Sequence, residues 1–264
     1  MAAPPVFYLI PGLGADERVF RLLRLPGTTH VLRWLPPQTP AEPLPHYAAR
    51  LAGIVPPGQP CWLVGVSFGG VLALEIAQLR PLARVILISS FAHPRELPWL
   101  GRLARATGLY RLLPPQLLPR LPRLASWFFG VKTIRDRQLL GQILRDTDPC
   151  FTRWAIARLL QWPGRPTTPT VRIHGTDDRL LPHGAAHSRY RLPGGHLIII
   201  SRAAEVSRIL EQLTEEKTIW PERYAERSRS ITRVLVAQSI RFYSMRDASA
   251  ALVMTFFCSL LITH

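Results

Sequence analysis

The sequence predicts an α/β fold in which a mostly parallel sheet is flanked by helices and carries a helical insertion. Short apolar runs suit buried parallel strands, helical patterns separate several of them, and one connection is far longer than the rest. The expected strands are residues 6–10, 30–35, 61–66, 84–89 and 170–175, with a weaker one at 188–192. Alternating strands and helices are typical of a sheet covered on both faces.

Three helices of the core are expected from their apolar patterns. They cover residues 47–54, 69–79 and 203–213. The second, "GGVLALEIAQL", follows directly on the apolar run 61–66 and is itself almost uncharged. A helix that is apolar all round is a buried helix, so this segment is expected in the centre of the protein.

The long connection predicts a helical cap. About 80 residues separate Ser89 from Thr170, whereas a crossover between parallel strands needs only about a dozen. The segment is proline-punctuated, and Asp148 followed by Pro149 is typical of an N-cap and first helical position. Three or four helices are expected over the carboxyl edge of the sheet. One face should pack the cap on the core through Phe151, Trp154, Ala155, Leu159 and Trp162.

These features divide the chain into three parts. Residues 1–90 plus 170–216 are expected to form the α/β core, 91–169 the cap and 217–264 a C-terminal extension. The apolar end of the extension, from Ala248 to Thr263, is shorter than the roughly 20 residues that span a bilayer. Docking on the core or disorder is therefore favoured over membrane anchoring.

Composition narrows the class of protein. The chain has 264 residues, is 47% hydrophobic and carries a formal net charge of +16. The basic residues are scattered arginines without a nucleic-acid motif, so a solvated surface is favoured and no nucleic-acid partner is expected. Three widely spaced cysteines without metal spacing, and no recognisable signal peptide, favour a cytoplasmic setting.

The stretch "GVSFGG" at 65–70 is the strongest chemical signal. A Gly-x-Ser-x-Gly turn between a strand and a helix is a nucleophile elbow, in which a sharp turn raises the serine hydroxyl above the sheet. Glycines at 65 and 69 leave room for the neighbouring backbone. The helix that begins at Phe68 points its free N–H groups toward the same place. Ser67 is therefore the candidate nucleophile.

A serine hydroxyl needs a general base and an orienting acid. Among the histidines, His196 stands out because it follows the turn-rich "LPGG" after the last expected strand. His174, within a strand end, is read as a satisfied or solvated residue. The segment "HGTDDRLLP" offers Asp177 and Asp178, of which only one side chain can normally face the histidine.

An acyl-transfer site also needs donors for an oxyanion. The loop "PGLG" at 11–14 follows the first expected strand, and its backbone N–H groups could act together with that of Phe68. A phosphate-binding interpretation is excluded because neither the GxGxxG nor the GxxxxGK pattern is present.

Taken together, residues 5 to 215 resemble the α/β-hydrolase superfamily, in the order oxyanion loop, elbow, cap, acid loop and histidine loop. The chain order Ser…Asp…His is that of the family. The resemblance implies Asp178 as the acid, with Asp177 in reserve, because Gly175 and Pro182 fit the family's pattern around it. It also implies that the N–H of Leu13 completes the oxyanion hole with that of Phe68.

The resemblance implies two-step acyl transfer on a small ester-like molecule by Ser67, His196 and Asp178, without cofactor or metal. An apolar acyl substrate is expected from the apolar cap. Thioester, amide, lactone or carbon–carbon bond hydrolysis, and perhydrolysis, remain open on the same fold. So do a non-catalytic binding protein of the same fold and a membrane-associated or partner-binding role of the tail. The sequence gives no indication of oligomeric state.

Overall fold

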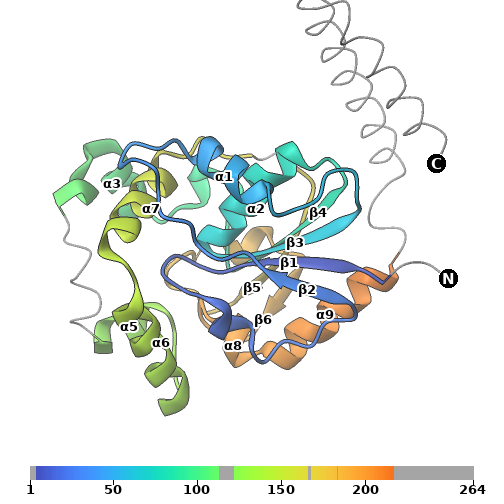
Figure 1. Cartoon of the computed structure of the whole chain (residues 1–264). Helices are drawn as coiled ribbons and strands as arrows, with labels where there is room; N and C mark the ends of the chain where they lie inside the picture. The colour runs from blue at the N-terminus through green and yellow to red at the C-terminus, as the bar shows by residue number, and fades with distance from the viewer. Residues whose placement is uncertain (1–3, 113–121, 166–167, 183, 217–264) are drawn as a thin grey trace, which may run out of the picture. The chain divides into compact units, whose positions relative to one another are not determined.

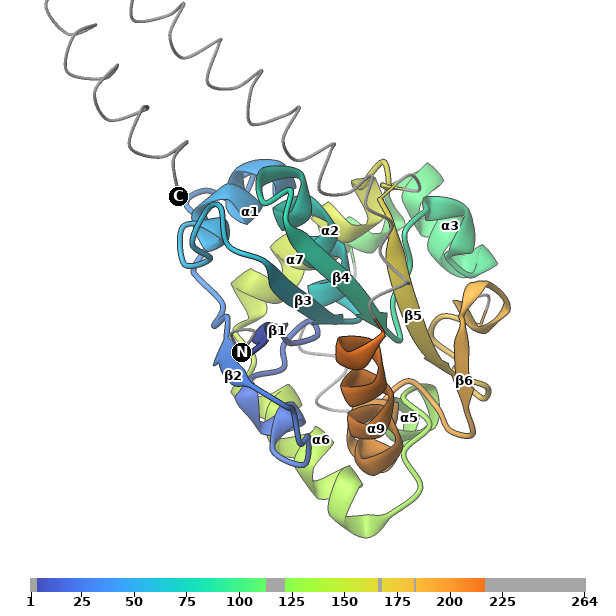
Figure 2. The ribbon, with the colours of Figure 1, turned by 90° about the vertical axis from the view of Figure 1, so that its right-hand side faces the viewer.

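A computed structural model describes residues 4–112, 122–165, 168–182 and 184–216 (Figure 1). Six strands form one sheet in the order β2-β1-β3-β4-β5-β6, and every neighbouring pair is parallel. Figure 2 shows the strands fanning from β2 at one edge to β6 at the other. They are β1 (Val6–Ile10), β2 (Thr28–Val31), β3 (Cys61–Val66), β4 (Ala83–Ile88), β5 (Thr170–Gly175) and β6 (Tyr190–Leu192).

The predicted parallel sheet is confirmed, and one strand was placed wrongly. Residues 30–35 were expected as a strand, but β2 ends at Val31. Beyond it, the N–H of Leu35 donates to Tyr47 Oη instead of to a strand. The indole of Trp34 donates to the carbonyl of Ala15. The backbone of Leu35 therefore bonds a side chain and not a neighbouring strand, which the apolar pattern alone could not reveal.

Helices cover both faces of the sheet. In Figure 1, α1 (Leu44–Ala52) and α2 (Phe68–Leu79) lie on one face, and α8 (Ile198–Ser201) and α9 (Ala203–Glu215) lie on the other. The first ten residues of α2 are all buried, as its uniformly apolar sequence predicts. The short helix α8, which the sequence analysis did not predict, buries Ile198, Ile199 and Ile200.

The connection between β4 and β5 is helical, as expected. It contains α3 (Trp99–Thr107), α5 (Pro122–Phe128), α6 (Ile134–Asp146) and α7 (Pro149–Gln161). The Asp148 carboxylate caps α7 by accepting from the Cys150 N–H, and Pro149 opens the helix. Short 3-10 turns occur at Glu17–Phe20, Pro94–Glu96, Leu109–Leu112 and Gly184–His187.

The predicted apolar face of α7 holds this insertion on the core. The buried residues of this face are Phe151, Trp154, Ala155 and Trp162. They belong to the hydrophobic core, and Leu159 is partly buried against it. The Trp162 indole donates to the buried carboxylate of Glu75 on α2 at 2.6 Å. The Trp154 indole donates to the carbonyl of Glu42 at 2.9 Å. Polar atoms of the two buried indoles are thus satisfied, as burial requires.

The predicted extension 217–264, including its apolar end, lies outside the described residues. Within the described ranges, no helix has the length and apolar character needed to cross a membrane. Cys61 is buried and Cys150 is exposed, and both are free thiols.

Candidate active site

Ser67 occupies a strained turn between β3 and α2. Its backbone has φ 52° and ψ −118°, a region that costs a non-glycine residue about 1–3 kcal/mol. The turn is held by the Ser67 N–H, which donates to the carbonyl of Ile88, and by the Ser67 carbonyl, which accepts from Ser90 Oγ at 2.7 Å. Strain maintained by surrounding bonds is what a nucleophile elbow requires.

The glycines around Ser67 permit close backbone packing. A Cβ on Gly65 would collide with the backbone of Gly69 and Gly70, and one on Gly69 would collide with the carbonyls of Ile10 and Pro11. The elbow therefore sits directly against the loop that follows β1. In that loop, the position of a Cβ on Gly12 would be 3.5 Å from the Cβ of Ser67.

Asp178 and Asp177 lie in different environments. Asp178 is 4% exposed, and both of its carboxylate oxygens are bonded. Oδ1 accepts from the N–H groups of Leu180 and Leu181, each at 2.9 Å. Oδ2 lies 2.8 Å from His196 Nδ1. The side chain of Asp177 is instead 57% exposed and lies 3.8 Å from Lys132 Nζ. Of the two adjacent carboxylates, Asp178 is therefore the one that contacts His196.

The surroundings of Asp178 keep it ionised. Burial raises its pKa, but the attraction of His196 and the hydrogen bonds from His174, His196 and Leu181 outweigh this, so the pKa lies well below its ordinary value. An ionised carboxylate only accepts hydrogen bonds. His196 Nδ1 must therefore carry the proton, and in the neutral ring Nε2 holds the free lone pair.

His196 is oriented but not fully bonded. It is 1% exposed, and its ring meets the ring of Phe129 from the cap with centroids 5.6 Å apart. Its Nε2 is buried, and none of the residues that the structure describes, Ser67 included, hydrogen-bonds it. An unpaired buried polar atom lowers the free energy of unfolding by about 1–3 kcal/mol. In native proteins such atoms often have a catalytic role, which would explain this one.

The loops that carry the acid and the histidine are bonded to each other. The Asp177 N–H donates to the carbonyl of Gly194 at 2.8 Å, and the Thr176 N–H donates to that of Leu192 at 2.9 Å. A Cβ on Gly175 would collide with the carbonyls of Gly194 and Gly195. Glycine at the end of β5 thus allows the two loops to approach closely enough for Asp178 to reach His196.

The expected oxyanion donors lie where the sheet ends. Phe68 is the first residue of α2, so its N–H has no acceptor within the helix. Leu13 lies in the loop after β1, next to Gly12. In the described part of the chain, neither N–H donates to another group. Both donors are free to bind an oxygen, and the backbone next to Leu13 lies close to Ser67.

Two residues at this edge were missed by sequence reasoning. His174 is buried, and its Nε2 lies 2.9 Å from Asp178 Oδ2 and 3.0 Å from the carbonyl of Leu181. The sequence predicts only a satisfied or solvated histidine there, and its i, i+4 spacing to Asp178 was the available signal. Ser89 has φ 47° at the end of β4 and a buried hydroxyl without a partner among the described residues. Nothing in its sequence marks it.

The cap meets the site at two points. A Cβ on Gly130 would lie 2.7 Å from the Cα of Gly195, so the turn after α5 packs on the residue that precedes His196. At the end of α6, Thr147 Oγ1 donates to the carbonyl of Gly14 at 2.8 Å. The cap therefore contacts both the histidine loop and the oxyanion loop. Among the described residues, no group of three or more His, Cys, Asp or Glu is placed to hold a metal ion.

Comparison with known proteins identifies the family of the chain. Residues 6–209 match the alpha/beta hydrolase family, and the chain belongs to that family. The predicted family and fold are confirmed. The fold is shared with a hydrolase from Oleispira antarctica, at TM-score 0.65 and 12% identity over 82% of this chain and 93% of that one. A thermophilic esterase from Thermogutta terrifontis has TM-score 0.57 and 16% identity over 82% and 91%.

One curated relative is a subunit of a different enzyme. The magnesium-chelatase 30 kDa subunit of Rhodobacter capsulatus is 26% identical over 238 residues, which cover 74% of this chain and 81% of that protein. Membership of the family supports hydrolase as the class of enzyme.

Proposed function

We propose that the protein is a serine hydrolase that cleaves a small ester-like molecule by two-step acyl transfer. The observation that carries this proposal is the buried Asp178–His196 pair, in which the outward nitrogen of the imidazole is left unpaired. Ser67 stands in a strained elbow at the same carboxyl edge of the parallel sheet. These are the acid, base and nucleophile of a triad.

Each residue has one role in the proposed reaction. His196 Nε2 takes the proton of Ser67 as Oγ attacks the acyl carbon, and the N–H groups of Leu13 and Phe68 bind the oxyanion. Asp178 holds the imidazolium by its Nδ1–H. The imidazolium then gives its proton to the leaving group, and an acyl-enzyme remains. His196 next takes a proton from the water that attacks the acyl-enzyme, and it gives this proton to Ser67 Oγ as the acyl–oxygen bond breaks and the carboxylic acid leaves.

Aromatic side chains beside the elbow support an apolar acyl group. The ring of Phe68 stacks on that of Trp34 at 5.7 Å, and Trp34 meets Phe151 of α7 at 5.0 Å. Leu13 packs against the hydrophobic core that contains Phe68 and Phe151. Phe68 and Phe151 are buried, whereas Leu13 in the oxyanion loop and Trp34 after β2 are only partly buried. An acyl chain beside the elbow would therefore contact Leu13 and Trp34. We place the reaction in the cytoplasm, which the free thiols of Cys61 and Cys150 support.

Labelling with a fluorophosphonate tests the nucleophile. The probe should modify Ser67 in the wild-type protein, fail on Ser67→Ala, and still label the matched control Ser201→Ala, which alters an exposed serine of α8. The same three proteins should then be assayed with acyl esters, thioesters, lactones and amides of varied chain length. Turnover of one class by wild type and Ser201→Ala alone identifies the bond. Equal turnover by Ser67→Ala would overturn the proposal.

A second candidate is a non-catalytic role within an assembly. One observation favours it: the relative from Rhodobacter capsulatus is named as a subunit. The missing hydrogen bond between His196 Nε2 and Ser67 is compatible with both functions, because catalytic hydrogen bonds often form only when substrate binds. Wild-type protein that remains unlabelled by the fluorophosphonate and inert on every ester would favour the subunit role.

A further inference from the structure

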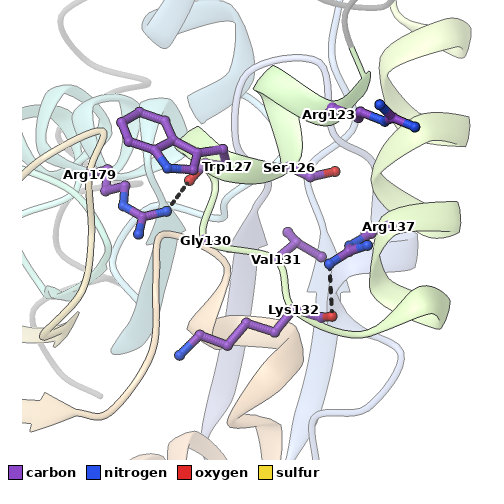
Figure 3. A pocket seen from close by; sticks show the side chains of 8 residues that line it. All are labelled: Arg123, Ser126, Trp127, Gly130, Val131, Lys132, Arg137 and Arg179. Carbon is purple, nitrogen blue, oxygen red and sulfur yellow. Dashed lines mark hydrogen bonds between the residues drawn. The ribbon is translucent and has the colours of Figure 1, made fainter.

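A basic pocket lies between the cap and the acid loop, outside the residues of the proposed triad. Its volume is about 470 Å³, and it is lined from three places in the chain: α5, the start of α6 with the turn before it, and Arg179. Figure 3 shows Arg179 and Trp127 on one side and Arg123 and Arg137 on the other. The size is within the range of small-molecule sites.

The residues that line the pocket are positively charged, without acidic residues among them. Four of its lining residues are cations, namely Arg123, Lys132, Arg137 and Arg179, and none is acidic. Lys132 Nζ lies 3.8 Å from Asp177 Oδ2, and this is the one ion pair that the four cations make with described residues. The three arginines form no ion pair with any residue that the structure describes. Like charges gathered without counter-charges repel one another, so an anion would relieve this repulsion.

One of the arginines is held in position. Arg179 Nη1 donates to the carbonyl of Trp127 at 2.9 Å, and its guanidinium lies over the indole ring, 4.5 Å from the centroid (Figure 3). The Trp127 side chain is nevertheless 53% exposed. A guanidinium stacked on an aromatic ring keeps its remaining N–H groups free for a carboxylate or phosphate. The contacts with Trp127 thus hold the Arg179 guanidinium in a position where it can bind a carboxylate or phosphate.

The pocket adjoins the triad. Arg179 directly follows Asp178 in the chain. Gly130, which lines the pocket, packs on Gly195, the residue before His196. A molecule bound in the pocket would therefore lie against the loops that carry the acid and the base.

We propose that this pocket binds a carboxylate or phosphate group of the substrate. The inference rests on the proposed hydrolase function and narrows it to molecules with an anionic group at some distance from the scissile bond. The arginines hold that group while the acyl part lies beside Leu13 and Trp34, which are only partly buried. The recognition is electrostatic and bidentate at each guanidinium, so it discriminates against neutral esters of the same shape.

A matched pair of ester series tests the proposal. One series consists of p-nitrophenyl monoesters of dicarboxylic acids from glutarate to suberate. The other replaces the free carboxylate of each by an isopropyl group of similar shape. Wild type should favour the anionic series at one chain length by about tenfold in kcat/KM, mainly through KM. The preference should disappear in Arg179→Gln and shrink in Arg123→Gln, which removes no hydrogen bond to another described residue.

The control is Arg135→Gln, an exposed arginine on the same helix as Arg137 that does not line the pocket. This variant should keep the wild-type preference for the anionic series. That result would show that the preference depends on the arginines of the pocket and not on the overall positive charge of the protein. Inorganic phosphate should compete with the anionic series and leave the neutral one unaffected. If it inhibits neither series while the preference persists, the ligand is a carboxylate. Equal kcat/KM for both series at every length, unchanged by Arg179→Gln, would overturn the proposal.

Binding without turnover separates this inference from the proposed function. Suberate should raise the melting temperature of wild type, Ser67→Ala and Arg135→Gln at constant ionic strength, raise that of Arg123→Gln less, and leave that of Arg179→Gln unchanged. If suberate stabilises wild type but no ester is hydrolysed, the hydrolase function is wrong and the anion-binding pocket is supported. If esters are hydrolysed without stabilisation by suberate and without a preference for the anionic series, the pocket is wrong and the hydrolase function is supported.

Discussion

The acid–histidine half of the site and the serine half are fixed equally well, but the connection between them is not made. Asp178 accepts bonds from two backbone N–H groups and two imidazoles. The backbone of Ser67 is bonded on both sides of the residue. Between these two networks stands His196 Nε2, buried and without a partner in the described part of the chain.

This difference indicates where preorganisation ends. The positions of nucleophile and base are each determined by bonds that exist before any ligand arrives, so neither has to be assembled during reaction. The bond from Ser67 Oγ to His196 is the remaining step, and such bonds often tighten only in the substrate complex. The predictions below test whether the two halves act as one unit, and how much of the acid half depends on each contact.

The largest effect is expected from removing the nucleophile or the base. Ser67→Ala and His196→Ala should each lower kcat by about 10⁶-fold, and the double variant should lose no more, because residues of one triad act as a unit. Single-turnover and steady-state rates on the best ester measure this, with Ser201→Ala as control. Losses that multiply in the double variant would mean that the two halves act independently.

The two adjacent carboxylates should differ strongly. Asp178→Asn should lower kcat by about 10⁴-fold, because an amide can no longer hold His196 in the tautomer that leaves Nε2 free. Asp177→Asn, at an exposed side chain, should change kcat by less than about threefold. The reverse order in steady-state kinetics would move the acid by one residue.

Much of this site follows from the sequence because its signals are local. The run from β3 through Ser67 into α2 is contiguous, and each glycine there is needed for a contact that only backbone can make. Strands β1, β3 and β5 have the predicted boundaries because continuous apolar runs identify buried parallel strands. Asp148 and Pro149 mark the start of α7 for the same local reason.

The features that were missed depend on contacts between distant segments. Strand β2 ends at Val31, and the backbone N–H of Leu35 donates to the side chain of Tyr47 on α1. The basic pocket unites Arg123 and Arg179, which are far apart in the chain, and the sequence shows them only as two of many scattered arginines. His174 was set aside because an isolated histidine in a strand has no signal beyond its spacing to Asp178.

His174 should affect turnover through Asp178, without touching the substrate. Its Nε2 shares Asp178 Oδ2 with His196, so His174→Gln should let the carboxylate shift and lower kcat by about tenfold with KM unchanged. The control is His187→Gln, at an exposed position in the turn before β6. If His174→Gln lowers the melting temperature and the fraction of active protein but leaves kcat per active site normal, the role of His174 is purely structural.

The smallest effect is expected in the pH dependence of stability. Because the pKa of Asp178 is lowered by folding, its carboxylate stabilises the native state above the unfolded-state pKa of about 3.9, and this stabilisation is lost as pH falls toward the native pKa. Between pH 6 and pH 3, the free energy of unfolding should therefore fall about 1 kcal/mol more in wild type than in Asp178→Asn.

Urea unfolding at a series of pH values measures that difference, and Asp177→Asn serves as the matched control. Since Asp177 is exposed and in distant contact with a single lysine, its variant should follow the wild-type curve. Every other carboxylate is common to the three proteins and cancels in the comparison. Parallel curves for wild type and Asp178→Asn would mean that Asp178 is no better stabilised in the native state than in the unfolded chain. The acid–histidine half would then be no more preorganised than its connection to Ser67.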